Sequence, residues 1–122
     1  MKFLTSLSVT FLLLMSVTTS PVAKADIASA LAGICDVVAS DNKSRFRKKI
    51  KEAGVKLRNI YDGISCGGEN LVRYAMQKNA QDTGTFIVKR MPSSHFESSG
   101  DADWAAANGF GGTDIAKEIA DR

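Results

Sequence analysis

The chain has 122 residues, a formal net charge of +3, two cysteines and a single histidine. This length allows one small domain after any processing. The low net charge excludes a uniformly basic protein of the kind that binds nucleic acid over its whole surface.

The first 25 residues have the three parts of a secretory signal peptide. Lys2 gives a positive start, residues 3–17 form an apolar stretch, and residues 18–21 interrupt it. Ala23-Lys24-Ala25 supplies the small residues that a signal peptidase requires. An uncleaved anchor is the alternative, but it needs about 20 apolar residues. We expect cleavage after Ala25, which leaves 97 residues of charge +1 and no transmembrane segment.

Both cysteines, Cys35 and Cys66, lie in the mature part of the chain. A signal peptide leads to an oxidising compartment, where two cysteines favour a single disulfide. The bond would close a loop of about 32 residues and stabilise the domain by roughly 3 to 4 kcal/mol. Two buried thiols are the alternative. The predicted location is the periplasm or the extracellular medium.

The fold predicted for residues 26–92 is a small, mostly α single domain with one disulfide. Apolar residues at spacings of three and four predict helices over residues 27–38, 43–53 and 69–79. Residues 55–68 have a mixed period and turn glycines, so we expect an ordered loop there, with short extended or helical pieces.

The segment from Thr85 to Met91 permits a strand or a helix. Its β-branched residues allow a strand, whereas its length and the preceding Asp82 and Thr83 favour a short helix, which Pro92 ends. Residues 93–122 are rich in serine, glycine and acidic residues, and we expect a flexible acidic tail with two short helical pieces.

Charge is unevenly distributed in the mature chain. Residues 41–60 hold eight basic and two acidic side chains, and residues 91–122 hold six acidic and two basic ones. We expect the basic helix to meet an anionic surface or an acidic protein, with the acidic tail as a competitor for the same face. The candidate binding residues are Arg45, Arg47, Lys48, Lys49 and Lys51. An ordinary solvated face is the alternative.

Catalytic and metal chemistry have little support. Cys66 precedes a predicted helix, whose N-terminus can activate a thiol. However, the one histidine, His95, lies in the predicted tail, and a disulfide removes the nucleophile. The tail acids lack the spacing of a calcium loop. We expect no enzyme activity, no metal and no cofactor. Nucleic acid is the least expected partner, because an exported protein rarely meets it and no aromatic stacking platform is spaced along the chain.

Several motifs between Asp41 and Pro92 carry a family likeness: Asp41-Asn42-Lys43, Arg47-Lys48-Lys49, Leu57-Arg58-Asn59-Ile60-Tyr61-Asp62-Gly63-Ile64, Ser65-Cys66-Gly67-Gly68, Leu71, Arg73-Tyr74-Ala75 and Phe86-Ile87-Val88-Lys89. This region resembles a domain-of-unknown-function family of small exported proteins from gammaproteobacteria. The family has no assigned activity, so the resemblance implies export and a disulfide but no catalytic residue. A weaker architectural similarity, to an ankyrin-type helix–turn–helix, fits one unit, whereas a stacked solenoid needs about three.

The function predicted from the sequence is a non-enzymatic exported interaction module that binds an anionic partner through its basic helix. Two alternatives stay open. One is a thiol-dependent enzyme or redox protein that uses Cys66. The other is a structural or stress-related periplasmic protein without a specific ligand.

Overall fold

The computed structural model describes residues 27–122, and the predicted signal peptide lies outside them. A helical segment at 27–30 precedes the elements α2 (Ile34–Ala39), α3 (Lys43–Ala53), α4 (Leu57–Ile60), η1 (Tyr61–Gly63), α5 (Leu71–Gln77), α6 (Gln81–Arg90), α7 (Ser93–Ser99), α8 (Asp101–Ala107) and α9 (Asp114–Ala120). The predicted mostly α class is therefore confirmed. Within residues 27–122, no helix has the length and apolar character needed to span a bilayer.

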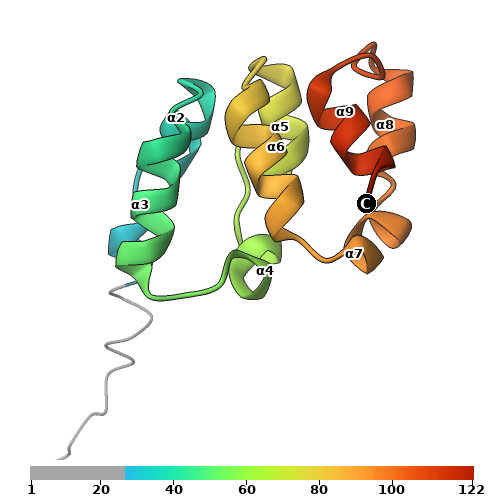
Figure 1. The fold of residues 1–122 in the computed structure, drawn as a ribbon. Coiled ribbons are helices and arrows are strands. Elements are labelled where there is room, and N and C mark those ends of the chain that lie inside the picture. Colours follow the sequence, from blue (N-terminus) through green and yellow to red (C-terminus); the bar gives the residue numbers. More distant parts are fainter. Residues whose placement is uncertain (1–26) are drawn as a thin grey trace, which may run out of the picture.

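Three helix pairs stand side by side in the described part of the chain (Figure 1). They are α2 with α3, α5 with α6, and α8 with α9. The first helices pack against each other from pair to pair, as do the second helices, and α4 and α7 connect the pairs at one edge of the stack. Three such units meet the minimum for a stacked arrangement, whereas the sequence pattern indicated only one.

The same turn joins the two helices of every pair. The first helix ends at a residue with a left-handed backbone: Asp41 (φ 53°), Asn79 (φ 55°) or Gly109 (φ 81°). The next backbone N–H then donates to the carbonyl five residues earlier: Asn42 to Val37 (3.2 Å), Ala80 to Ala75 (2.8 Å) and Phe110 to Ala105 (2.7 Å). This closure satisfies carbonyls that the helix end leaves free. The three pairs are thus equivalent units, although their turns lie 38 and then 30 residues apart in sequence.

One apolar core runs through all three pairs. Its fully buried side chains include Val38 and Phe46 from the first pair, Leu71 and Ile87 from the second, and Ile115 from the third. The middle pair is therefore covered on both sides, by α3 on one and by α9 on the other.

The expectation of a flexible tail over residues 93–122 is wrong. This segment forms α7, α8 and α9, and its side chains Ala105 and Ile115 have no exposed surface. Glycine and serine serve helix ends here rather than a linker, since Gly100 ends α7 in a left-handed conformation. The helical domain consequently does not stop at residue 92, because α9 packs along α6.

Other boundaries differ in detail. Thr85 to Met91 falls largely within α6, which begins earlier, at Gln81, so the preference for a helix is confirmed. The first predicted helix is broken at Gly33, whose backbone is left-handed (φ 75°). The predicted helix 43–53 matches α3, which Asn42 caps by accepting a hydrogen bond from the backbone N–H of Arg45.

Candidate functional site

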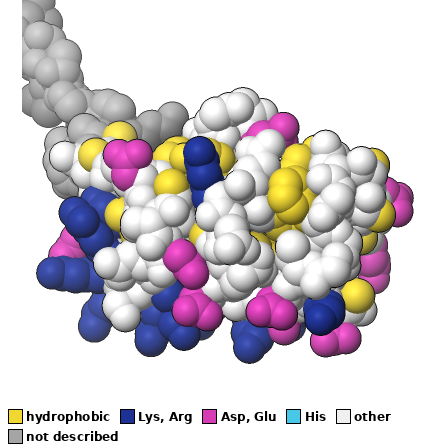
Figure 2. Space-filling model, turned by 90° about the horizontal axis from the view of Figure 1, so that it is seen from above, with side chains coloured by type: hydrophobic (Ala, Val, Ile, Leu, Met, Phe, Trp, Pro, Cys, Tyr) yellow, Lys and Arg dark blue, Asp and Glu magenta, His cyan; other side chains and the backbone are white. Residues whose placement is uncertain are grey.

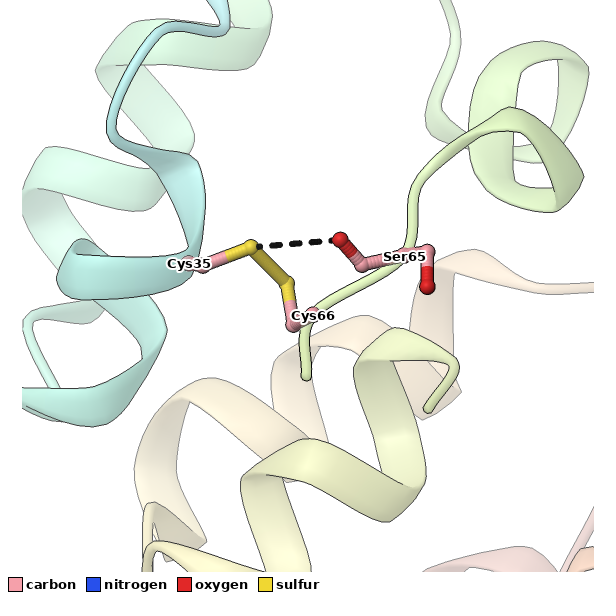
Figure 3. Close-up of a disulfide and its surroundings, with 3 residues drawn as sticks. All are labelled: Cys35, Ser65 and Cys66. Carbon is pink, nitrogen blue, oxygen red and sulfur yellow. Dashed lines mark hydrogen bonds between the residues drawn. A yellow bond between two sulfur atoms is a disulfide. The ribbon is translucent and has the colours of Figure 1, made fainter. Parts of the chain in front are cut away.

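The cysteines join the first helix pair to the segment that leads into α5. Cys35 and Cys66 form a disulfide with their Cα atoms 5.6 Å apart, as Figure 3 shows. The 3.6 Å contact from Cys35 Sγ to the Ser65 carbonyl is a packing contact, because a disulfide sulfur carries no proton to donate. The predicted pairing is confirmed. While the bond is intact, neither sulfur can act as a nucleophile, and this weakens the case for a thiol enzyme.

A groove of about 740 Å³ lies between α3, the segment at 55–58 and α6. Its apolar lining consists of Ile50, Val55, Leu57 and Phe86. Its cationic lining consists of Arg47, Lys48, Lys51, Lys56, Arg58 and Arg90, with Ser44 beside them. None of the residues that line the groove carries a carboxylate. We call this feature the cationic groove.

The packing of α3 decides which of its basic residues enter the groove. Phe46 is fully buried and meets the ring of Phe86 edge to face, with 6.0 Å between the centroids. This contact fixes the rotation of α3 against α6. Arg47 and Lys51 are one turn apart, so both face the groove that opens beside the contact.

Phe86 also lies under two guanidinium groups. The Cζ of Arg47 lies 5.7 Å from the ring centroid, and the Cζ of Arg90 lies 5.1 Å from it. Arg90 follows Phe86 by one turn of α6, whereas Arg47 comes from α3. Neither guanidinium forms an ion pair with another residue in the range 27–122. Two like charges are therefore held near one ring without a neutralising partner.

The structure separates the five predicted binding residues into two sets. Arg47, Lys48 and Lys51 line the cationic groove, whereas Arg45 and Lys49 do not. The Nζ of Lys49 instead donates to the carbonyl of Ala32, at 2.7 Å. Three groove cations were missing from the predicted site: Lys56, Arg58 and Arg90. The sequence signal that could have identified Arg90 is its position one helical turn after the aromatic Phe86.

The acidic residues of α7 to α9 do not neutralise the basic helix. Within residues 27–122 the ion pairs are Lys48 with Glu52, at 3.9 Å, and Arg73 with Asp101, at 2.8 Å. Figure 2 shows that most Lys and Arg side chains on the visible face gather toward one end of the molecule, on the left of the view, whereas Asp and Glu side chains are spread across that face. The expected competition from a mobile tail is wrong, because α9 is fixed against α6 and its acids belong to the third pair.

A second, more polar pocket of about 490 Å³ is lined by residues of η1, the segment before α5, and α7. Tyr61 is buried there, its phenol oxygen accepts the backbone N–H of Val72 at 3.2 Å, and burial raises its pKa above the ordinary value of 10.0. The ring of His95 lies edge-on to the rings of Tyr61 and Phe96, with 4.9 Å between centroids in both cases. His95 therefore packs among aromatic rings. Across the described range, no group of three or more His, Cys, Asp or Glu side chains is placed to hold a metal ion.

These features define a small helical protein with three stacked helix pairs, one disulfide and a cationic groove. The family model described as "Protein of unknown function (DUF3718)" matches residues 34–98, more than half of the chain, and the chain belongs to this family. The match confirms the resemblance to a domain-of-unknown-function family. It spans both cysteines and every residue of the cationic groove, whereas α8 and α9 follow it. No curated protein and no solved structure matches the chain.

Proposed function

We propose that this protein is a non-enzymatic interaction module that binds an anionic partner in the cationic groove. The supporting observation is that six cationic side chains line one groove whose lining holds no carboxylate. Like charges brought together in a fold repel one another and raise the local positive potential. A bound anion would relieve that repulsion, so the groove favours anionic ligands.

The shape of the groove narrows the class of partner. Its volume of about 740 Å³ lies within the range of small-molecule sites, which is about 300–1,000 Å³. Apolar side chains line it together with the cations, which suits a ligand that has anionic groups on an apolar body. Nucleic acid is a poor fit, because Phe86 is the one aromatic lining residue and its ring already contacts two guanidiniums and Phe46.

We also propose that the protein is exported and loses residues 1–25. The disulfide supports this proposal, because such bonds persist mainly in oxidising compartments. The intact mass of protein recovered from the periplasm or the medium should correspond to a chain that begins at Asp26. Recovery of a chain that still begins at Met1 would contradict export by cleavage.

The binding proposal is tested with the mature chain and anionic vesicles that contain phosphatidylglycerol. A groove variant carries Arg47→Gln, Lys51→Gln and Arg90→Gln. A control variant carries Arg45→Gln, Lys89→Gln and Lys117→Gln, which removes the same charge from positions outside the groove. We expect the groove variant to lose most vesicle binding at low salt, and the control to keep it.

Salt provides a second measurement on the same samples. Raising the ionic strength from 0.1 M to 1 M shortens the screening length from about 10 Å to about 3 Å and should weaken binding by the parent chain. Equal losses in the two variants would show that net charge alone matters and would contradict a groove site. If the parent chain binds neither vesicles nor soluble polyphosphate at low salt, the remaining alternative is a structural or stress-related protein without a specific ligand.

A further inference from the structure

The structure points to a more specific ligand chemistry: we propose that Arg47 and Arg90 together bind the phosphate of a phosphate monoester. This inference rests on the proposed function, because it assigns a ligand class to the same groove. Its starting point is the pair of guanidiniums that approach the ring of Phe86 at 5.7 Å and 5.1 Å.

The aromatic ring holds the two arginine heads in place without neutralising them. A guanidinium near an aromatic ring is attracted by the ring's π electrons, but its N–H groups keep their capacity to donate hydrogen bonds. Phe86 is itself held by the edge-to-face contact with the fully buried Phe46. Two donor groups from different helices are thus positioned before any ligand arrives, and this lowers the entropy cost of binding.

Arginine at both positions favours a phosphate over a simple carboxylate. A guanidinium donates two parallel hydrogen bonds to an oxyanion, which the point charge of lysine cannot do. A phosphate monoester carries nearly two negative charges at neutral pH and has three terminal oxygens. It therefore offers acceptors to both arginines at once, whereas one carboxylate has two oxygens and a single charge.

The other residues that line the groove suit both the phosphate and the organic part of a phosphate monoester. Ser44 and Lys48 line the same groove and add a hydroxyl group and an ammonium group. Ile50, Val55 and Leu57 provide an apolar lining for the organic part of the ester. The headgroup of phosphatidic acid and a soluble sugar phosphate both present a phosphate monoester, so the experiment includes both as probes.

The test uses substitutions that keep the charge. Arg47→Lys and Arg90→Lys remove the guanidinium and retain a cation. Arg45→Lys is the matched control, because Arg45 is an exposed arginine of α3 that does not line the groove. Binding of glucose 6-phosphate is measured by calorimetry, and binding of phosphatidic acid vesicles by flotation. We expect Arg47→Lys and Arg90→Lys each to weaken binding by about tenfold, and Arg45→Lys to change it less than about twofold.

The Phe86→Leu variant tests separately whether the Phe86 ring positions the two arginines. We expect it to weaken binding of the same probes, because both arginines lose the ring that positions them. Phe86 is half-buried and packs on Phe46. The melting curve of the Phe86→Leu variant is therefore recorded first. If that variant unfolds, the two lysine variants carry the test, since Arg47 and Arg90 are exposed.

The outcomes distinguish this inference from the proposed function. Binding of glucose 6-phosphate with loss in both lysine variants supports a site for a soluble phosphate ester, and the same pattern with phosphatidic acid alone supports a lipid headgroup. If the lysine variants bind both probes as the parent does, while the triple glutamine variant loses vesicle binding, the anion-binding function stands and the two-arginine phosphate site is overturned. If the parent binds neither probe but still binds phosphatidylglycerol vesicles, the phosphate monoester is likewise overturned.

Discussion

The Nε of Arg73 on α5 donates to Oδ1 of Asp101 on α8 at 2.8 Å, and this ion pair ties the second helix pair to the third. Asp101 is fully buried, and its Oδ1 also accepts a hydrogen bond from Asn70. Arg73 donates further to the carbonyl of Ser99 and lies near Trp104, with 5.3 Å from its Cζ to the ring centroid. The segment expected to be mobile is thus attached by a buried charge.

Arg73→Ala should lower the free energy of unfolding by about 3–5 kcal/mol, because it leaves the Asp101 carboxylate buried without its cation. Urea unfolding followed by the fluorescence of Trp104, the one tryptophan, measures the change. Lys48→Ala is the control, since it removes an exposed ion pair of 3.9 Å and should cost less than about 1 kcal/mol. Equal effects in the two variants would contradict a structural role for Asp101.

Removal of residues 95–122 should abolish the cooperative melting transition, because the truncation uncovers the side of α6 that α9 covers. A milder form of this test is Ile115→Ala, which should cost about 2–5 kcal/mol, since the side chain is fully buried. Lys117→Ala, on the exposed side of the same helix, serves as the control. A melting temperature of the truncated chain within a few degrees of the parent would restore the interpretation as a tail.

Gly84→Ala should destabilise the protein by about 1–3 kcal/mol, although alanine is the better helix former. A Cβ at Gly84 would collide with the Cδ1 and Cγ1 atoms of Ile115 and would lie 3.1 Å from the Cβ of Ala75. Combining Gly84→Ala with Ile115→Ala should cost less than the sum of the two single changes, because the smaller side chain makes room. Strict additivity in denaturant unfolding would show that α6 and α9 do not meet there.

Cys66→Ser should lower the free energy of unfolding by about 2–5 kcal/mol, since the disulfide links positions 31 residues apart. Reduction of the parent chain should produce a similar loss, and the variant should not respond to the reductant. Peptide mapping without reductant should recover the cross-linked Cys35 and Cys66 peptides. Two alkylatable thiols in protein isolated from an oxidising compartment would contradict the bond.

Tyr61→Phe should make stability less sensitive to alkaline pH. Burial raises the pKa of Tyr61 above 10.0, so the folded chain keeps a proton that the unfolded chain releases. The free energy of unfolding that the raised pKa of Tyr61 contributes is fully present below about pH 10, and it is lost as the pH rises toward the folded-state pKa. At pH 7 the variant should cost about 1–3 kcal/mol, because the N–H of Val72 loses its acceptor. Tyr74→Phe is the control in unfolding titrations from pH 8 to 11, and it should keep the steep alkaline loss.

The sequence by itself determined the local features of this protein. Helix α3 follows from the apolar spacing of Phe46 and Ile50 and from Gly54, which ends it, all within one short window. The disulfide between Cys35 and Cys66 follows from the count of cysteines and the expected compartment. The helix depends on residues that are near one another in the chain. The cysteine pairing has a single possible partner for each thiol, because the chain has two cysteines.

Only the tertiary structure decided the cationic groove and the attachment of the last two helices. Arg47 and Arg90 meet at the ring of Phe86 because Phe86 packs against Phe46 across two helices, and no local spacing records that contact. Helices α8 and α9 have seven residues each, too few to be stable alone. Their few apolar side chains therefore resemble a linker in sequence, and they become helical because the exposed side of the second pair supplies the surface on which they are buried.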